Sequence, residues 1–151
     1  MLIDKSSANP GTILGIDYGL KRVGLAVSDE NGRLAVGAGW LEGLSGRSLA
    51  RRIKAEADKR NAKLVVIGQP PEGVRDSDRV AAGADELAAA LEKMGLETKR
   101  HDESYTTSTV LAERKKYGGK SSKPRGWIDE AAAILILQSY IDMLKSTSVT
   151  V

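Results

Sequence analysis

The stretch GIDYGLKRVGLAVSD, residues 15–29, places an acid at the end of an apolar run. The run leads into Asp17, and Lys21 and Arg22 follow after a glycine. A second apolar run begins directly after these two bases. Short apolar runs that are rich in β-branched residues and bounded by turn residues are typical of buried strands. The stretch therefore predicts two strands, residues 12–18 and 22–28, joined by a tight turn.

The rest of the chain alternates helix and strand patterns. A third strand, 33–41, follows the Asn31-Gly32 turn and completes an antiparallel meander. The later elements are a helix from Ser48 to about 60, a strand 63–68, a helix 77–94, a strand 97–103, and helices 106–117 and 127–144. Helices that alternate with strands favour parallel pairing. The order βββαβαβαα thus predicts an α/β fold with a mixed five-stranded sheet flanked by helices.

The composition is that of one ordinary globular domain. The 151 residues are 41% hydrophobic and 28% charged, which excludes a disordered chain. We expect a flexible N-terminal tail at 1–11, a domain at 12–145 and a C-terminal tail at 146–151. The absence of cysteine excludes disulfides and thiolate metal sites. Neither a signal core nor a long apolar run is present, so we expect a cytoplasmic protein without a membrane partner.

The net charge of +3 does not by itself indicate nucleic acid. The charge is unevenly distributed, however, because residues 114–125 hold six bases and no acid. Such a segment is either a solvated linker or a loop that grips phosphates.

Asp17 ends the first predicted strand on the face that also carries Ile13 and Gly15, because strand side chains alternate. Gly15 and Gly19 leave room for a ligand near the backbone. An acid close to a glycine is also common in turns. Local sequence leaves both interpretations of Asp17 open, a ligand and a turn residue.

Further acids lie at the ends of other predicted elements. Asp102 and Glu103 end the fifth strand and face opposite ways, so at most one can point into a shared site; a role at the following helix start is the alternative. Asp129 begins the last helix in line with an apolar stripe that includes Ala133 and Ile136. Its position at the inner edge of a core-facing helix favours a functional role over a capping role.

Three acids on separate elements beside a basic segment fit a divalent-metal site. Mg²⁺ and Mn²⁺ prefer oxygen ligands. Two such ions, about 3.5–4 Å apart, support displacement at a phosphodiester by activating water and stabilising the leaving oxygen. His101, the single histidine, has no partners for a zinc site. It either orients substrate or packs in the core, and we expect packing.

Four motifs, in this order, resemble the YqgF/RuvX family of ribonuclease H-like proteins: GIDYGLKRVGLAVSD, KLVVIG with a proline-containing loop, HDESYTT and WIDEAAAILILQSYID. The similarity covers about residues 13–143. It implies a ribonuclease H-like fold and a metal-dependent nuclease. Members are described as nucleases that process the 5′ end of pre-16S ribosomal RNA, and some as Holliday-junction-resolvase-like enzymes.

The resemblance also implies site residues. Asp17, Glu103 and Asp129 correspond to the family's catalytic acids and would hold the metal ions. Lys21 and Arg22 match a basic pair that would contact substrate phosphates. The basic segment would add further phosphate-binding residues, namely Lys115, Lys116, Lys120, Lys123 and Arg125.

Two positions depart from the family pattern. Ser104 and Tyr105 replace an Arg and an apolar residue, which removes a charge beside the proposed site and affects substrate affinity or specificity. Gln69 is unusual after the fourth strand, although Pro70 and Gly73 keep the character of the loop. All three acids are present, which favours a catalytic protein.

We therefore expect a metal-dependent nuclease acting on structured RNA, most directly the 5′ end of pre-16S ribosomal RNA, free or in a pre-ribosomal particle. A resolvase of branched DNA is the same chemistry on another substrate. It would need a dimer, and the sequence leaves monomer and homodimer open. A nucleic-acid-binding module without catalysis is the alternative of another class. A nucleotide-binding domain of the actin/sugar-kinase type would need two lobes, and this chain supplies one.

Overall fold

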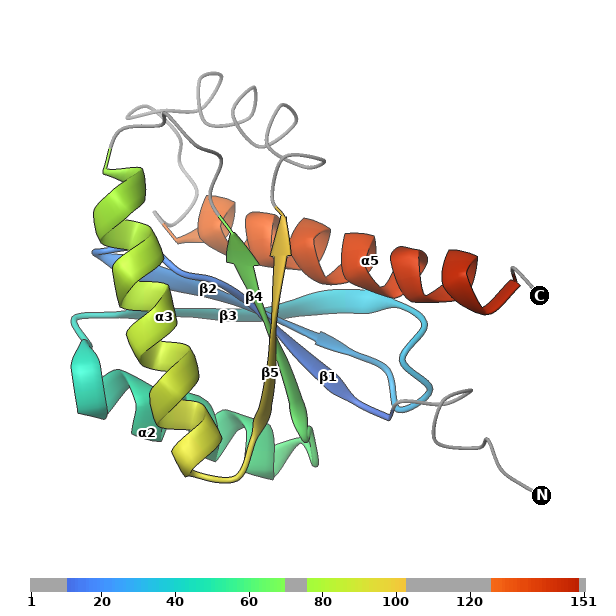
Figure 1. Cartoon of the computed structure of the whole chain (residues 1–151), viewed down its shortest axis with the longest axis horizontal. Coiled ribbons are helices and arrows are strands. Elements are labelled where there is room, and N and C mark those ends of the chain that lie inside the picture. The colour runs from blue at the N-terminus through green and yellow to red at the C-terminus, as the bar shows by residue number, and fades with distance from the viewer. Residues whose placement is uncertain (1–10, 70–75, 103–125, 150–151) are drawn as a thin grey trace.

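The computed structural model describes residues 11–69, 76–102 and 126–149 (Figure 1). The described part holds five strands and three helices. In chain order they are β1 (Ile13–Asp17), β2 (Arg22–Ser28), β3 (Ala35–Glu42), α2 (Gly46–Lys59), β4 (Leu64–Gln69), α3 (Ser77–Lys93), β5 (Glu97–Asp102) and α5 (Trp127–Val149).

The five strands form one mixed sheet in the order β3-β2-β1-β4-β5. The pairs β1/β2 and β2/β3 are antiparallel, whereas β1/β4 and β4/β5 are parallel. The predicted meander and the predicted parallel pairing of the later strands are both confirmed. Since β1, β4 and β5 run in the same direction, their carboxyl ends lie at the same edge of the sheet.

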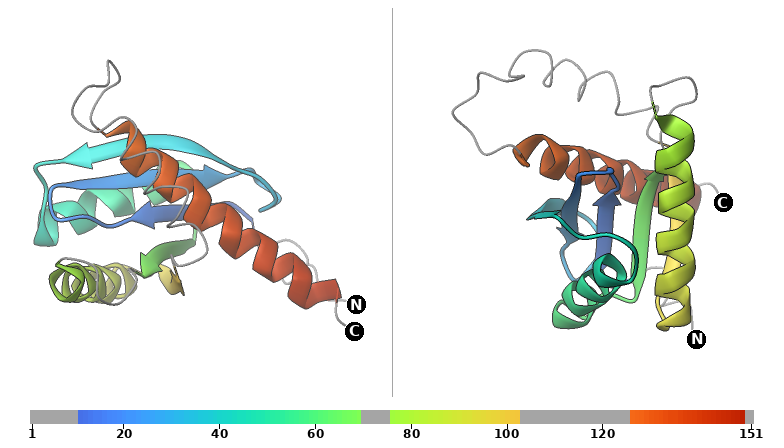
Figure 2. Two further views of the ribbon diagram at one scale, coloured as in Figure 1. Left: turned by 90° about the horizontal axis from the view of Figure 1, so that it is seen from above. Right: turned by 90° about the vertical axis from the view of Figure 1, so that its left-hand side faces the viewer.

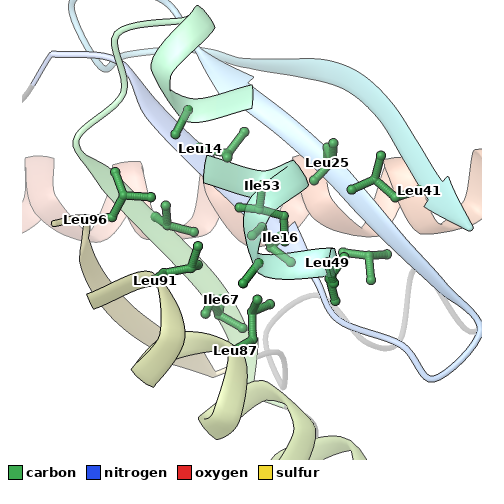
Figure 3. Packing of buried hydrophobic residues seen from close by; sticks show 14 of the residues in the cluster. Leu14, Ile16, Leu25, Leu41, Leu49, Ile53, Ile67, Leu87, Leu91 and Leu96 are labelled. Atoms are coloured by element: carbon green, nitrogen blue, oxygen red, sulfur yellow. The ribbon is translucent and has the colours of Figure 1, made fainter. Parts of the chain in front are cut away.

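The helices cover opposite faces of this sheet (Figure 2). Helices α2 and α3 pack together on one face, where Leu14 and Ile16 of β1 meet Ile53 and Leu91 in the larger core (Figure 3). Helix α5 crosses the other face alone, mainly against β1, β2 and β3. Because side chains alternate along β1, Leu14 and Ile16 pack in the larger core, whereas Ile13 packs on the α5 side.

Helix α5 lies unusually close to β1, and Gly15 is the reason. A Cβ atom at Gly15 would lie 2.7 Å from the Cβ of Leu137, closer than packed side chains allow. Leu137 is fully buried at this crossing. The missing side chain in the strand thus sets the depth at which α5 sits on the sheet.

Two predicted element ends differ from the structure. The N-cap of α2 is Ser45, not Ser48; the Ser48 hydroxyl instead donates to the Ser45 carbonyl at 2.8 Å. Because Ser48 bonds back into the first turn, the helix begins at Gly46. At the other end of the chain, α5 continues to Val149, beyond its predicted end near 144 and into the segment that we expected to be a tail.

Several predictions lie outside the described residues: the N-terminal tail apart from Gly11, the helix 106–117 and the basic segment 114–125. Among the helices that the structure does describe, none is long and apolar enough to cross a membrane.

We predict that Leu137→Ala lowers the free energy of unfolding by about 2–5 kcal/mol, because it removes a fully buried side chain and leaves a cavity. Met143→Ala on the same helix should cost less than about 0.5 kcal/mol, since Met143 is 45% exposed. Urea denaturation measures both values. Equal costs at the two positions would contradict the packing described for α5.

Candidate active site

Asp17 lies at the carboxyl end of β1 and is only 7% exposed. Ile13 and Gly15, four and two residues earlier, face α5, so Asp17 faces the same side. A buried carboxylate is costly unless charge or hydrogen bonds compensate it. Asp17 is therefore placed under α5, at the end of a strand, as a ligand would be.

Gly24 of β2 lies between Asp17 of β1 and the first turn of α5. Asp17 and Gly24 are direct partners across the antiparallel β1/β2 ladder. A Cβ atom at Gly24 would lie 1.9 Å from the backbone oxygen of Asp129 and 2.9 Å from the backbone nitrogen of Glu130. The first turn of α5 thus rests directly on the Gly24 backbone. The Asp129 backbone, 112 positions beyond Asp17 in the chain, thus lies against the β2 residue that pairs with Asp17.

The Asp129 side chain pairs with Arg22. The Nε of Arg22 donates to Oδ2 of Asp129 at 3.0 Å, and the Asp129 side chain is 14% exposed. Arg22 precedes Gly24 by two residues in β2, so both face α5. The sequence predicted Arg22 as a phosphate-binding residue. In the structure its guanidinium compensates the charge of a predicted metal ligand.

Two residues that the sequence analysis missed hold α5 in place over this site. The Glu130 carboxylate accepts a hydrogen bond from the Gly39 backbone N–H of β3 at 2.7 Å. Gly126, just before α5, lies against the Trp40 ring so closely that a Cβ atom would fall 2.1 Å from it. Because Trp40 pairs with Gly24 across β2/β3, both contacts belong to the same end of the sheet. A glycine before a helix gave no sequence signal for such a contact.

His101 is a packing residue in the described structure. It lies on β5, 9% exposed, within hydrogen-bond distance of the Ser139 hydroxyl (2.9 Å) and edge-on to the Tyr140 ring. Burial lowers the pKa of His101, and the Asp102 charge opposes that shift. Burial also raises the pKa of Tyr140. These contacts support packing of His101 rather than substrate orientation.

The remaining predicted site residues divide into two groups. Lys21 is exposed in the β1–β2 turn, next to Arg22. The others lie outside the described residues: Glu103, Lys115, Lys116, Lys120, Lys123 and Arg125. Glu103 follows Asp102, which is the last residue of β5.

The two described carboxylates fit a hard divalent cation. Asp17 and Asp129 supply oxygen donors from two elements that meet at Gly24, and both are largely shielded from water. Mg²⁺ and Mn²⁺ are bound through such oxygens. Within the described ranges, no three acidic or histidine side chains are grouped closely enough to hold a metal. The described residues thus supply two candidate oxygen ligands.

Solved structures with this fold come from nucleases. The chain matches Thermus RuvC, solved as "T. thermophilus RuvC in complex with Holliday junction substrate", with a TM-score of 0.58 at 15% identity, over 91% of this chain and 97% of that chain. The Fowlpox virus resolvase, solved with Holliday junction DNA, matches with a TM-score of 0.53 at 11% identity, over 88% and 98%. At such identities the likeness shows the fold, which is ribonuclease H-like as predicted.

Sequence comparison identifies the family. A protein from Syntrophus aciditrophicus, named a pre-16S rRNA nuclease, is 34% identical over 91% of this chain and 92% of its own length. Relatives with the same name from Mycobacterium tuberculosis (37%; 87% and 79%) and Chlorobaculum tepidum (35%; 91% and 97%) agree. The profile of RuvX, described as Holliday junction resolvase, matches residues 11–143. The chain belongs to the RuvX family, and it is therefore a nuclease, a hydrolase of phosphodiester bonds.

We predict that Gly24→Ala destabilises the protein by about 1–3 kcal/mol or more, because its methyl group would overlap the Asp129 backbone. Gly37→Ala is the matched control in β3. Its methyl group would meet the Glu130 side chain, which can shift at the cost of its hydrogen bond from Gly39, so a smaller loss of about 0.5–1.5 kcal/mol is expected. Urea denaturation compares the two variants. If Gly24→Ala costs no more than Gly37→Ala, α5 does not rest on Gly24.

Proposed function

We propose that this nuclease depends on divalent metal ions, Mg²⁺ or Mn²⁺, held by Asp17, Asp129 and Glu103. The observation that carries the proposal is the meeting of Asp17 and Asp129 at Gly24, on the side of the sheet covered by α5. Glu103 directly follows β5, whose carboxyl end lies at the same sheet edge as that of β1. These three acids would supply oxygen ligands from three elements to one or two ions.

When bound, a pair of such ions would supply Lewis-acid stabilisation of the charge that develops at the scissile phosphate. The protein's own residues do the positioning. Asp17 is fixed by its place in the central strand, and Asp129 is fixed by the contact of its backbone with Gly24. Neither carboxylate can move far without disturbing the sheet or α5. Such preorganisation is what a site for phosphoryl chemistry requires.

Arg22 has two successive roles in this proposal. Without substrate it balances the Asp129 charge through the 3.0 Å contact. With a divalent cation beside Asp129, the guanidinium is no longer needed there and is free to bind a substrate phosphate in a bidentate way. Lys21, exposed beside it, and the bases of segment 114–125 would contact neighbouring phosphates.

The substrate we propose is precursor ribosomal RNA, cut near the 5′ end of 16S RNA in the cytoplasm, free or in a pre-ribosomal particle. The support comes from relatives at 34–37% identity that carry the name pre-16S rRNA nuclease and match most of this chain. These relatives are far closer to this chain than the solved junction resolvases at 11–15% identity.

Branched DNA is the second candidate substrate. The RuvX family is described as Holliday junction resolvase, and structural neighbours were solved with junction DNA. Cleavage of a four-way junction at two symmetric positions needs two active sites, and thus a homodimer. An active protein that remains a monomer on the junction would favour RNA as the substrate.

We predict that Asp17→Asn lowers cleavage by more than about a hundredfold while the protein stays folded, because the amide cannot replace a charged ligand oxygen. Cleavage of precursor ribosomal RNA and of a four-way DNA junction is measured with Mn²⁺ and with EDTA, and folding by circular dichroism. Asp78→Asn, an exposed acid on α3, is the matched control and should retain activity. Full cleavage by Asp17→Asn would contradict the ligand assignment. Binding without cleavage by the wild type in Mn²⁺ would favour a non-catalytic binding module.

A further inference from the structure

Helix α2 and the turn that follows it carry an excess of positive charge. Residues 46–63 contain seven basic and two acidic residues, an excess of five, although the whole chain has a net charge of only +3. The other two described helices are acidic, with four acids and two bases in α3 and three acids and one base in α5. The excess of positive charge is therefore concentrated in residues 46–63, and helix α2 of this segment lies on the sheet face opposite the proposed metal site.

Both acids of α2 form ion pairs with bases one helical turn away. Glu56 pairs with Arg60 at 2.5 Å and with Arg52 at 3.4 Å, and Asp58 pairs with Lys54 at 2.7 Å. Four bases remain that make no ion pair with any described residue, all of them exposed: Arg47, Arg51, Lys59 and Lys63.

Two of these bases lower the stability of the helix that carries them. Arg47 lies in the first turn, which contains no acid, so its charge opposes the positive end of the helix dipole. Arg51, four residues later, is a like-charge neighbour on the same surface. The buried side of α2 is made by Leu49, Ile53 and Ala57, so neither arginine contributes to the core. Binding of an external anion would offset the cost of this arginine pair to the helix.

The start of α2 lies at the same end of the sheet as the proposed metal site, although the helix covers the opposite face. Arg22, which contacts Asp129, is the direct partner of Glu42 at the end of β3. Only five positions separate Glu42 from Arg47, a span of at most about 18 Å. Figure 1 shows α2 beginning where β3 ends, on the side where α5 begins, and the right-hand view of Figure 2 shows the starts of both helices from that side.

We propose that the outer face of α2, through Arg47 and Arg51, binds the phosphate backbone of a duplex flank of the substrate, remote from the bond that is cut. The proposal rests on the nuclease function for the identity of the partner. An 18 Å span corresponds to about five base steps of a duplex. The substrate is then a nucleic acid with a paired region beside the scissile bond, since Arg47 lies within about five base steps of Glu42, the strand partner of Arg22.

The test measures binding in EDTA, which makes the result independent of metal and of cleavage. Two versions of one substrate are compared, with a duplex flank of 4 or of about 12 base pairs, each prepared as RNA and as DNA. The variant is Arg47→Gln/Arg51→Gln. Its control is Arg33→Gln/Arg79→Gln, which removes two exposed arginines elsewhere and changes the net charge equally.

For the long flank, Arg47→Gln/Arg51→Gln should reduce the slope of log K against log salt by about 1.4–1.8, the value for two lost phosphate contacts. The short flank and the control should change by less than about 0.5 in the same slope. A stronger effect on RNA or on DNA identifies the preferred flank. Equal slopes for the variant and the control on the long flank would overturn the proposal and leave the metal site untouched. No binding by the wild type would overturn both this proposal and the proposed function.

Discussion

The contact between Gly24 and the first turn of α5 is the constraint on which the site depends. A side chain at Gly24 would occupy the space of the Asp129 carbonyl, 1.9 Å from its Cβ position. Because the strand offers bare backbone there, α5 approaches β2 closely enough to bring Asp129 beside Asp17, the partner of Gly24 in β1. Gly15 allows a second close approach about two turns further along α5, under Leu137. The same close approach buries the helix and places the Asp129 backbone against the strand partner of Asp17.

Burial of two carboxylates costs desolvation free energy, which an ion pair offsets in part. Arg22 compensates Asp129 across 3.0 Å, and it is drawn from the same strand as Gly24. Breaking such a pair would leave an uncompensated, largely buried charge. A divalent cation compensates the same charges more fully. Under the proposed function, a cation bound beside Asp129 would therefore leave the Arg22 guanidinium available for a substrate phosphate.

Much of this arrangement could be predicted from the sequence, since strand alternation and helix periodicity fix which face a residue occupies. Asp17 on the α5 side of β1, Asp129 at the inner edge of the last helix and the mixed sheet follow from those two periods. The partner of Arg22 could not be predicted, because Arg22 and Asp129 are 107 positions apart and meet only once α5 has docked. The roles of Gly24 and Glu130 depend on the same docking. The sequence did not separate the unpaired bases of α2 from the paired ones, because Arg52 and Lys54 form their ion pairs only on the folded helix.

The central claim, that Asp17 and Asp129 form one metal site at Gly24, is tested most directly by titrating ¹⁵N-labelled protein with substoichiometric Mn²⁺. The paramagnetic ion broadens the amide resonances nearest to it. A site at Gly24 predicts that Tyr18, Gly24 and Glu130 lose intensity first, while Ala55 on α2 and Ala89 on α3, beyond the sheet, persist. Broadening that begins at the exposed acids of α3, or that affects all amides equally, would contradict it.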